Sequence, residues 1–277
     1  MLKKILVVLD GSDASRSAKK YALKIAKKLK AELTGVGIID IPWITAAQPE
    51  PLGGAAFKIH RDEEIIKQTH KRIAEMLKVF ANECEKGGLK FSLAELQGFP
   101  ATEIERLAEE HDLIIIGKTT DFHFELDVDT DLTVRYIVRD NPRPIIVVTT
   151  DKEIDDNIII AYDGSLQAAR ALHMFLLLGL GADGHAHILS VARAQKEANE
   201  IAKSAQIMCE THGMKAEIEG IASRKAPEDV LKKKIKEYNA GLVIMGAYGH
   251  HGLKEWIFGT TTEHLLKEAE TALFIHH

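Results

Sequence analysis

Residues 5–12 read ILVVLDGS, and residues 158–165 repeat the pattern as IIIAYDGS. Each copy is an apolar run of strand length, followed by Asp-Gly and then by a serine, a residue type that often caps a helix. A buried strand that leads directly into a helix is typical of a parallel α/β sheet. Because the unit occurs twice, we expect two copies of the same α/β domain in one chain.

Two further repeats support a duplication. Residues 84–90 (CEKGGLK) recur as residues 209–215 (CETHGMK), and residues 112–117 (DLIIIG) recur as residues 241–246 (GLVIMG). The three pairs keep the same order along the chain, which chance explains poorly. The two cysteines then occupy the same small apolar position twice and need no redox role.

The domain boundary is expected in a short charged stretch at residues 150–156. We therefore place a first domain at residues 1–150 and a second at residues 156–277.

Strand and helix patterns alternate through both copies. The first copy predicts strands at 3–9, 31–39, 90–96, 113–117 and 143–149, with helices at 18–29, 62–86, 101–111 and 132–140. The second copy predicts strands at 157–162, 185–191, 215–220, 242–246 and 272–276, with helices at 166–178, 195–212, 226–238 and 260–269. This alternation predicts an α/β fold, with a parallel sheet and helices on both faces in each domain. An extra segment around residues 40–60, rich in Pro and Ala, predicts a loop or lid in the first copy.

Composition excludes several classes of protein. The 277 residues suit two domains, and 45% hydrophobic residues suffice for buried cores. A formal net charge of −5 gives no broad basic field, so we expect neither a nucleic-acid nor a membrane partner. The apolar runs are strand-sized, too short to span a bilayer. Two cysteines in a chain of this length do not predict a disulfide framework, and we expect a cytoplasmic protein.

A glycine-rich segment follows the predicted strand 242–246, where ligands bind in open parallel sheets. Residues 246–252 read GAYGHHG, and Gly259 precedes three threonines that open a predicted helix. Glycines let a backbone approach a ligand closely, and a helix N-terminus presents free N–H groups to phosphate. An ordinary turn followed by a helix cap explains the same residues, and the residues alone leave both interpretations open.

Gly246 is followed after two intervening residues by Gly249, and Gly249 is followed after nine intervening residues by Gly259 and Thr260. This spacing resembles the nucleotide-binding signature of the universal stress protein family. The resemblance covers nearly the whole chain, once in each of the two copies. It therefore implies a tandem member of this family. It also implies five-stranded parallel sheets with strand order 3-2-1-4-5. An ATP-binding member would hold ATP, ADP or AMP, with or without Mg²⁺, and would act in stress response or regulation.

The resemblance also implies roles for individual residues. Asp163 would face the nucleoside, the backbone of Val191 would meet the adenine, and Met245 and Gly246 would flank the sugar and phosphates. The phosphates themselves would be cradled by Gly249, His250, Gly259, Thr260 and Thr261. The signature assigns no catalytic residue, and no general base is evident. ATP hydrolysis would therefore be slow at best.

The first copy departs from this signature. Gly117 is present, but Thr120 replaces the second glycine. An acidic run follows, which consists of Glu125, Asp127, Asp129 and Asp131. These carboxylates would repel a polyphosphate, so we predict that the first domain binds no ATP. The acidic run resembles the opening of a calcium loop but lacks its glycine and closing glutamate, which favours a domain without a metal site.

Residues 145–148 and 273–275 are expected to pair within one chain, because domains of this family pair through their last strands. This pairing would give an intramolecular pseudo-dimer, and two chains would be able to associate into a homodimer. The alternatives to a nucleotide-binding regulator are an adenylating or ATP-hydrolysing enzyme of the related α-hydrolase-like group and a ligand-free scaffold. The enzyme needs a glycine-rich loop after its first strand, and residues 163–165 are too short for one.

Overall fold

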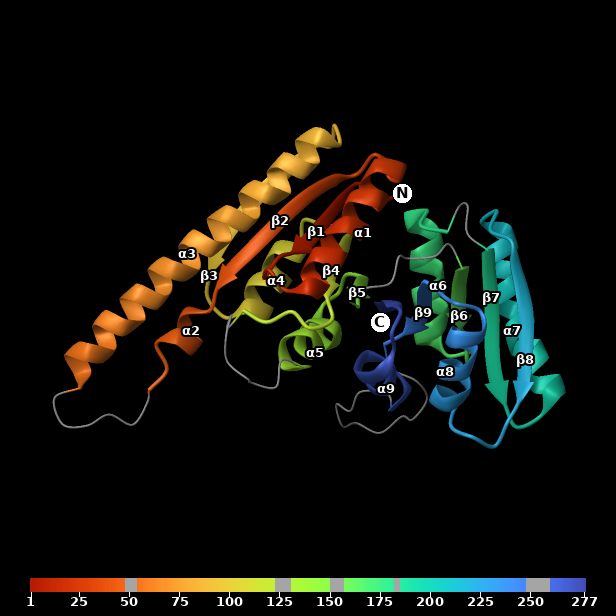
Figure 1. Cartoon of the computed structure of the whole chain (residues 1–277). Coiled ribbons are helices and arrows are strands. Elements are labelled where there is room, and N and C mark those ends of the chain that lie inside the picture. Colours follow the sequence, from red (N-terminus) through yellow and green to blue (C-terminus); the bar gives the residue numbers. More distant parts are fainter. Residues whose placement is uncertain (48–53, 123–130, 150–156, 182–184, 248–259) are drawn as a thin grey trace.

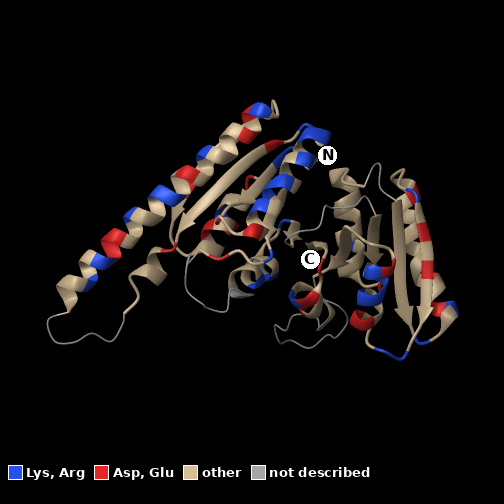
Figure 2. Cartoon of the chain, in the orientation of Figure 1, with Lys and Arg blue, Asp and Glu red and all other residues tan. Residues whose placement is uncertain are grey.

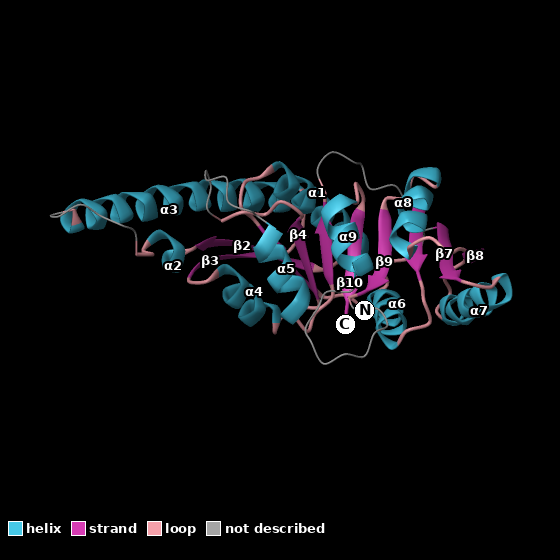
Figure 3. Cartoon of the chain, turned by 90° about the horizontal axis from the view of Figure 1, so that it is seen from below, coloured by secondary structure: helices cyan, strands magenta, loops and turns pink. Residues whose placement is uncertain are grey.

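The computed structural model describes residues 1–47, 54–122, 131–149, 157–181, 185–247 and 260–277. The strands of these residues form a single sheet with helices on both faces (Figures 1 and 3). The first half contains β1 Lys4–Val8, α1 Asp13–Leu29, β2 Glu32–Ile39, α2 Ile41–Ile44, α3 Ala55–Lys86, β3 Phe91–Gln97, α4 Pro100–Ala108, β4 Leu113–Gly117, α5 Asp131–Asp140 and β5 Ile145–Val148. The second half contains β6 Asn157–Ala161, α6 Leu166–Leu178, β7 His185–Ala192, α7 Gln195–Thr211, β8 Ala216–Ala222, α8 Pro227–Glu237, β9 Leu242–Gly246, α9 Thr260–Glu268 and β10 Ala272–His276.

The strand order across the sheet is β3-β2-β1-β4-β5-β10-β9-β6-β7-β8. Each half therefore has the expected order 3-2-1-4-5, and neighbouring strands within a half are parallel. The halves meet where β5 and β10 pair antiparallel, with Ile146 opposite Phe274. The pairing predicted for the last strands is thus present, and it merges two parallel sheets into one ten-stranded mixed sheet.

The continuous apolar runs arise because both faces of the sheet are buried. In β1, Ile5 and Val7 belong to the core cluster that includes residues of α1 and α3. Leu6 and Val8 belong to a second cluster, which includes residues of α4 and α5. Alternate residues of a strand face opposite sides, so a strand covered on both sides has no polar face.

The prediction of a loop or lid around residues 40–60 was wrong for most of the residues that the structure describes there. Helix α2 occupies Ile41–Ile44, and α3 begins at Ala55. Apolar periodicity missed this part of α3 because its large side chains bury little, and Phe57 is 73% exposed. Local interactions support the helix here, including the ion pair between Lys58 and Asp62 one turn apart. Charges of both signs alternate along α3 (Figure 2).

The repeated cysteines and serines have equivalent surroundings in the two halves. Cys84 and Cys209 are both fully buried and free, and burial raises the pKa of each thiol to about 11. Ser12 and Ser165 cap α1 and α6 by accepting hydrogen bonds from Ser15 N and Ala168 N. Among the described helices, none is both long and apolar enough to cross a membrane.

Candidate functional site

Asp163 lies just beyond the carboxyl end of β6, where the sequence predicted the nucleoside. Its Oδ1 accepts a hydrogen bond from Ser165 N at 2.9 Å, which fixes the turn into α6. The residue is exposed, and its second carboxylate oxygen has no hydrogen-bond partner among the described residues. Asp163 therefore presents an available acceptor at this edge of the sheet.

Val191 lies near the carboxyl end of β7, beside the end of β6. The preceding residue, Ser190, is fully buried, and its hydroxyl donates to the Tyr162 carbonyl at 2.7 Å. This hydrogen bond fixes the two strand ends relative to each other and so sets the separation of Asp163 and Val191. The sequence did not single out Ser190, although a serine between the apolar residues Leu189 and Val191 was a signal for it.

Gly246 ends β9 beside the first turn of α6. A Cβ at this position would lie 2.6 Å from Ala168 N, so no larger residue fits without displacing the helix backbone. Gly117 has the same constraint in the first half, where a Cβ would lie 2.6 Å from Ser15 N. Packing thus requires the first glycine of the signature in both halves, and its presence alone does not indicate a ligand site.

Helix α9 begins at Thr260, as the sequence predicted for the phosphate-facing helix. The Thr261 hydroxyl donates to the Glu228 carboxylate at 3.1 Å, which links α9 to the first turn of α8. Thr262, which the sequence prediction omitted, is 2% exposed and donates to the Gly246 carbonyl at 3.3 Å. These two threonines fix the start of α9 relative to β9 and α8.

Met245 is buried at the end of β9, immediately before Gly246. Gly249, His250 and Gly259 lie outside the described residues, and so do Glu125, Asp127 and Asp129 of the first half. The described part of the site therefore consists of the strand ends around Asp163, Val191 and Gly246, together with the start of α9.

Asp10, the counterpart of Asp163, is buried and fully hydrogen-bonded. Its Oδ1 accepts from Ser12 N at 3.0 Å and from Ser12 Oγ at 2.8 Å. Its Oδ2 accepts from Asp121 N at 2.6 Å. Burial raises the pKa of the Asp10 carboxyl, although hydrogen bonds from Asp121 and Ser12 oppose the shift. In the first half, the loop after β4 therefore satisfies the carboxylate of Asp10. In the second half, the equivalent carboxylate of Asp163 stays available.

The residues on either side of Asp121 fill the same end of the first half. Thr120, which replaces the second glycine of the signature, is fully buried, and Phe122 is 3% exposed within the core cluster that contains α4 and α5. The hydroxyl of Thr120 is buried without a hydrogen-bond partner among the described residues. The loop after β4 is thus packed into the first half through Thr120 and Phe122, and it is hydrogen-bonded to Asp10 through Asp121.

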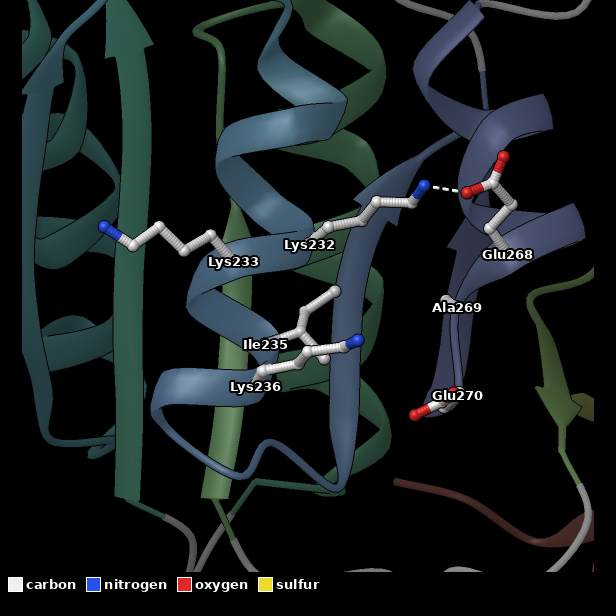
Figure 4. Close-up of a pocket in the computed structure, with 7 residues that line it drawn as sticks. All are labelled: Lys232, Lys233, Ile235, Lys236, Glu268, Ala269 and Glu270. Atoms are coloured by element: carbon white, nitrogen blue, oxygen red, sulfur yellow. Dashed lines mark hydrogen bonds and ion pairs between the residues drawn. The ribbon is translucent and has the colours of Figure 1, made fainter.

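A separate cavity of about 450 Å³ lies between α8 and α9 (Figure 4). Its lining consists of Lys232, Lys233, Ile235, Lys236, Glu268, Ala269 and Glu270. Lys232 forms an ion pair with Glu268 across it, so the lysine charge is partly neutralised. None of the predicted site residues lines this cavity, which is therefore distinct from the candidate site. In the part of the chain that the structure describes, no cluster of side chains is arranged to hold a metal ion.

The comparisons agree with this architecture of two repeated α/β halves. The universal stress protein family model matches residues 1–124 and 156–276, and the chain belongs to that family. Its two matched segments correspond to the tandem halves of the sheet.

Similar proteins come from distant organisms. Universal stress protein Slr1230 of Synechocystis sp. is 26% identical over 282 residues, which cover 96% of this chain and 97% of that protein. Universal stress protein MJ0531 of Methanocaldococcus jannaschii is 31% identical over 156 residues, which cover 55% of this chain and 85% of that protein. The crystal structure of a universal stress protein from Archaeoglobus fulgidus has a TM-score of 0.72 at 20% identity, covering 99% of this chain and 97% of that one.

Proposed function

We propose that this tandem universal stress protein binds an adenine nucleotide in its second half and acts in stress response or regulation. The ligand is ATP, ADP or AMP, with or without Mg²⁺, and the proposed location is the cytoplasm. The observation that carries the proposal is the contrast between Asp163, which keeps an available carboxylate oxygen, and Asp10, whose carboxylate is satisfied by its own chain.

The contrast matters because a nucleoside sugar is a hydrogen-bond donor. An exposed carboxylate at the carboxyl ends of parallel strands can accept hydrogen bonds from sugar hydroxyls. The start of α9 supplies a helix N-terminus at the same edge, where N–H groups and the helix dipole favour phosphate. In the proposed complex, Asp163 and Val191 contact the nucleoside, while Thr260, Thr261 and the signature glycines contact the phosphates.

The first half is proposed to bind no nucleotide. The carboxylate of Asp10 is hydrogen-bonded to Asp121 N, and the neighbouring Thr120 and Phe122 are packed into the interior of the first half. This explanation differs from the charge repulsion inferred from the sequence, because it depends on occupied space and satisfied hydrogen bonds. The first half would then serve as a structural partner of the second.

Denaturing the purified protein and analysing the released small molecules by mass spectrometry tests the proposal. Bound ATP, ADP or AMP is the expected result, together with a rise in Tm when nucleotide is added to ligand-free protein. No released nucleotide and no change in Tm with ATP would indicate the ligand-free scaffold. Stoichiometric conversion of ATP with a second substrate would instead support the adenylating enzyme.

A pair of variants at corresponding loop positions tests the assignment to the second half. Gly249→Val should abolish the nucleotide-dependent rise in Tm, because a branched side chain blocks the close approach of backbone to phosphate. Thr120→Gly should leave that rise unchanged. A rise that disappears in Thr120→Gly and persists in Gly249→Val would place the site in the first half and contradict the proposal.

A further inference from the structure

Helix α9, which opens at the candidate phosphate position, is held at its other end by the first half of the chain. Lys118 directly follows β4, and its Nζ donates to the carbonyl of Lys267 at 2.8 Å and to that of Ala269 at 3.0 Å. These carbonyls lie at the C-terminal end of α9, where helix carbonyls lack partners within the helix. A cation at this end also interacts favourably with the helix dipole.

A second contact joins α9 to α5 of the first half. Arg135 on α5 forms an ion pair with Glu263 in the first turn of α9. The two helices lie side by side next to the junction of β5 and β10 (Figures 1 and 3). Through Lys118 and Arg135, the first half therefore contacts both ends of α9.

The Arg135–Glu263 pair lies across the pseudo-twofold axis of the molecule. Ile146 opposes Phe274 at the centre of the β5–β10 pairing. Arg135 precedes Ile146 by eleven residues, and Glu263 precedes Phe274 by eleven residues, so the two occupy equivalent positions. In a dimer of identical halves, these positions would carry like charges. The duplication has instead placed opposite charges there, which favours this pairing of unlike halves.

The second half supplies the remaining contacts of α9. Thr261 and Thr262 fix its start against Glu228 and the Gly246 carbonyl, and Lys232 pairs with Glu268 (Figure 4). The helix is only nine residues long, and helices of this length are marginal without tertiary contacts. The position of its N-terminus therefore depends on both halves.

We propose that Lys118 and Arg135 are positioning residues for the nucleotide site of the second half, acting through α9. The inference rests on the proposed function and assigns the first half a role in it. The loop after β4 closes the first half's own site through Asp121 and supports the site of its partner through Lys118. Nucleotide affinity in the second half then depends on residues that contact no nucleotide.

Isothermal titration of ATP into Lys118→Met and Arg135→Met tests this inference. Each variant should bind ATP roughly threefold to tenfold more weakly than the wild type, as expected for loss of a charged contact at a helix terminus. Lys118→Arg should recover most of the affinity, because its guanidinium can donate to the same carbonyls. Lys71→Met, at an exposed lysine of α3, is the matched control and should bind as the wild type does.

Amide hydrogen exchange of residues 261–268 provides a second measurement. Exchange in α9 should be faster in Lys118→Met than in the wild type or Lys71→Met, because the C-terminal carbonyls lose their donor. Unchanged exchange in α9 would overturn the inference whether or not nucleotide binds. Faster exchange with unchanged ATP affinity would overturn the link to the site. A wild-type protein that binds no nucleotide would contradict the proposed function, while the exchange data still decide whether Lys118 holds α9.

Discussion

At the scale of single residues, the two repeated aspartates show how one sequence pattern acquires two roles. Asp10 and Asp163 follow equivalent strands and are both followed by Gly and a capping Ser. Asp10 is 4% exposed and accepts a hydrogen bond from Asp121 N, whereas Asp163 is exposed. The difference originates in the loop after β4, more than a hundred residues from Asp10. The residues next to each aspartate in the sequence therefore do not reveal this difference.

Replacing each aspartate by alanine should separate these roles. Asp163→Ala should weaken ATP binding by about 1.5–3 kcal/mol, the usual contribution of a hydrogen bond to a charged group, with little change in stability. Asp10→Ala should leave ATP affinity unchanged and lower the free energy of unfolding by about 1–3 kcal/mol, because it leaves the partly buried Asp121 N–H without its acceptor. Calorimetric titration and urea unfolding measure the two quantities. Equal loss of affinity in both variants would refute the asymmetry.

At the scale of elements, close contact between a strand end and a helix start explains the first glycine of the signature. Gly117 lies against the first turn of α1, and Gly246 lies against the first turn of α6. The spacing of residues identified these glycines correctly as special. The reason that glycine is needed at these positions, however, is the close approach of two backbone segments that are distant in sequence. The spacing of residues does not reveal this approach.

Gly117→Ala and Gly246→Ala should therefore both destabilise the protein, by about 1–3 kcal/mol or more, because overpacking against backbone is hard to relieve. Gly88→Ala is a useful comparison. Its φ of +64° is strained for alanine, but a Cβ there would meet nothing within 4 Å, so the loss should reflect backbone strain alone. Urea unfolding measures all three. A Gly117→Ala protein as stable as the wild type would show that packing does not require this glycine.

At the scale of the whole molecule, the junction of the halves is a three-pair antiparallel contact between β5 and β10, supported by cross-half contacts of α9. His276, at the end of β10, lies within this region, and its Nδ1 is buried without a partner among the described residues. Burial lowers the pKa of His276 to about 4, and nearby His277, Arg170 and Arg143 add to the shift. The imidazole is therefore held neutral in the folded protein.

This shift predicts a loss of stability on acidification. Between about pH 6.5 and about pH 4, the unfolded chain binds a proton at His276 that the folded chain does not, so the free energy of unfolding falls as pH falls. His276→Gln should show a shallower decline over this range than the wild type. Parallel urea unfolding curves at several pH values measure the slopes. Identical slopes for His276→Gln and the wild type would contradict the prediction.

The sequence by itself determined the duplication, the α/β class, the strand order through the family resemblance, and the residues at the carboxyl ends of the strands. These features follow from local apolar runs, caps and turns, whose physical causes lie within a few residues of one another. The start of α3 was not predicted, because it buries little apolar surface and so shows no apolar periodicity. Only the tertiary structure decided that Asp121 satisfies Asp10, that Gly246 is required by α6, and that Lys118 supports α9. Each of these contacts joins segments far apart in the chain, and their energies depend on distances that the order of residues does not specify.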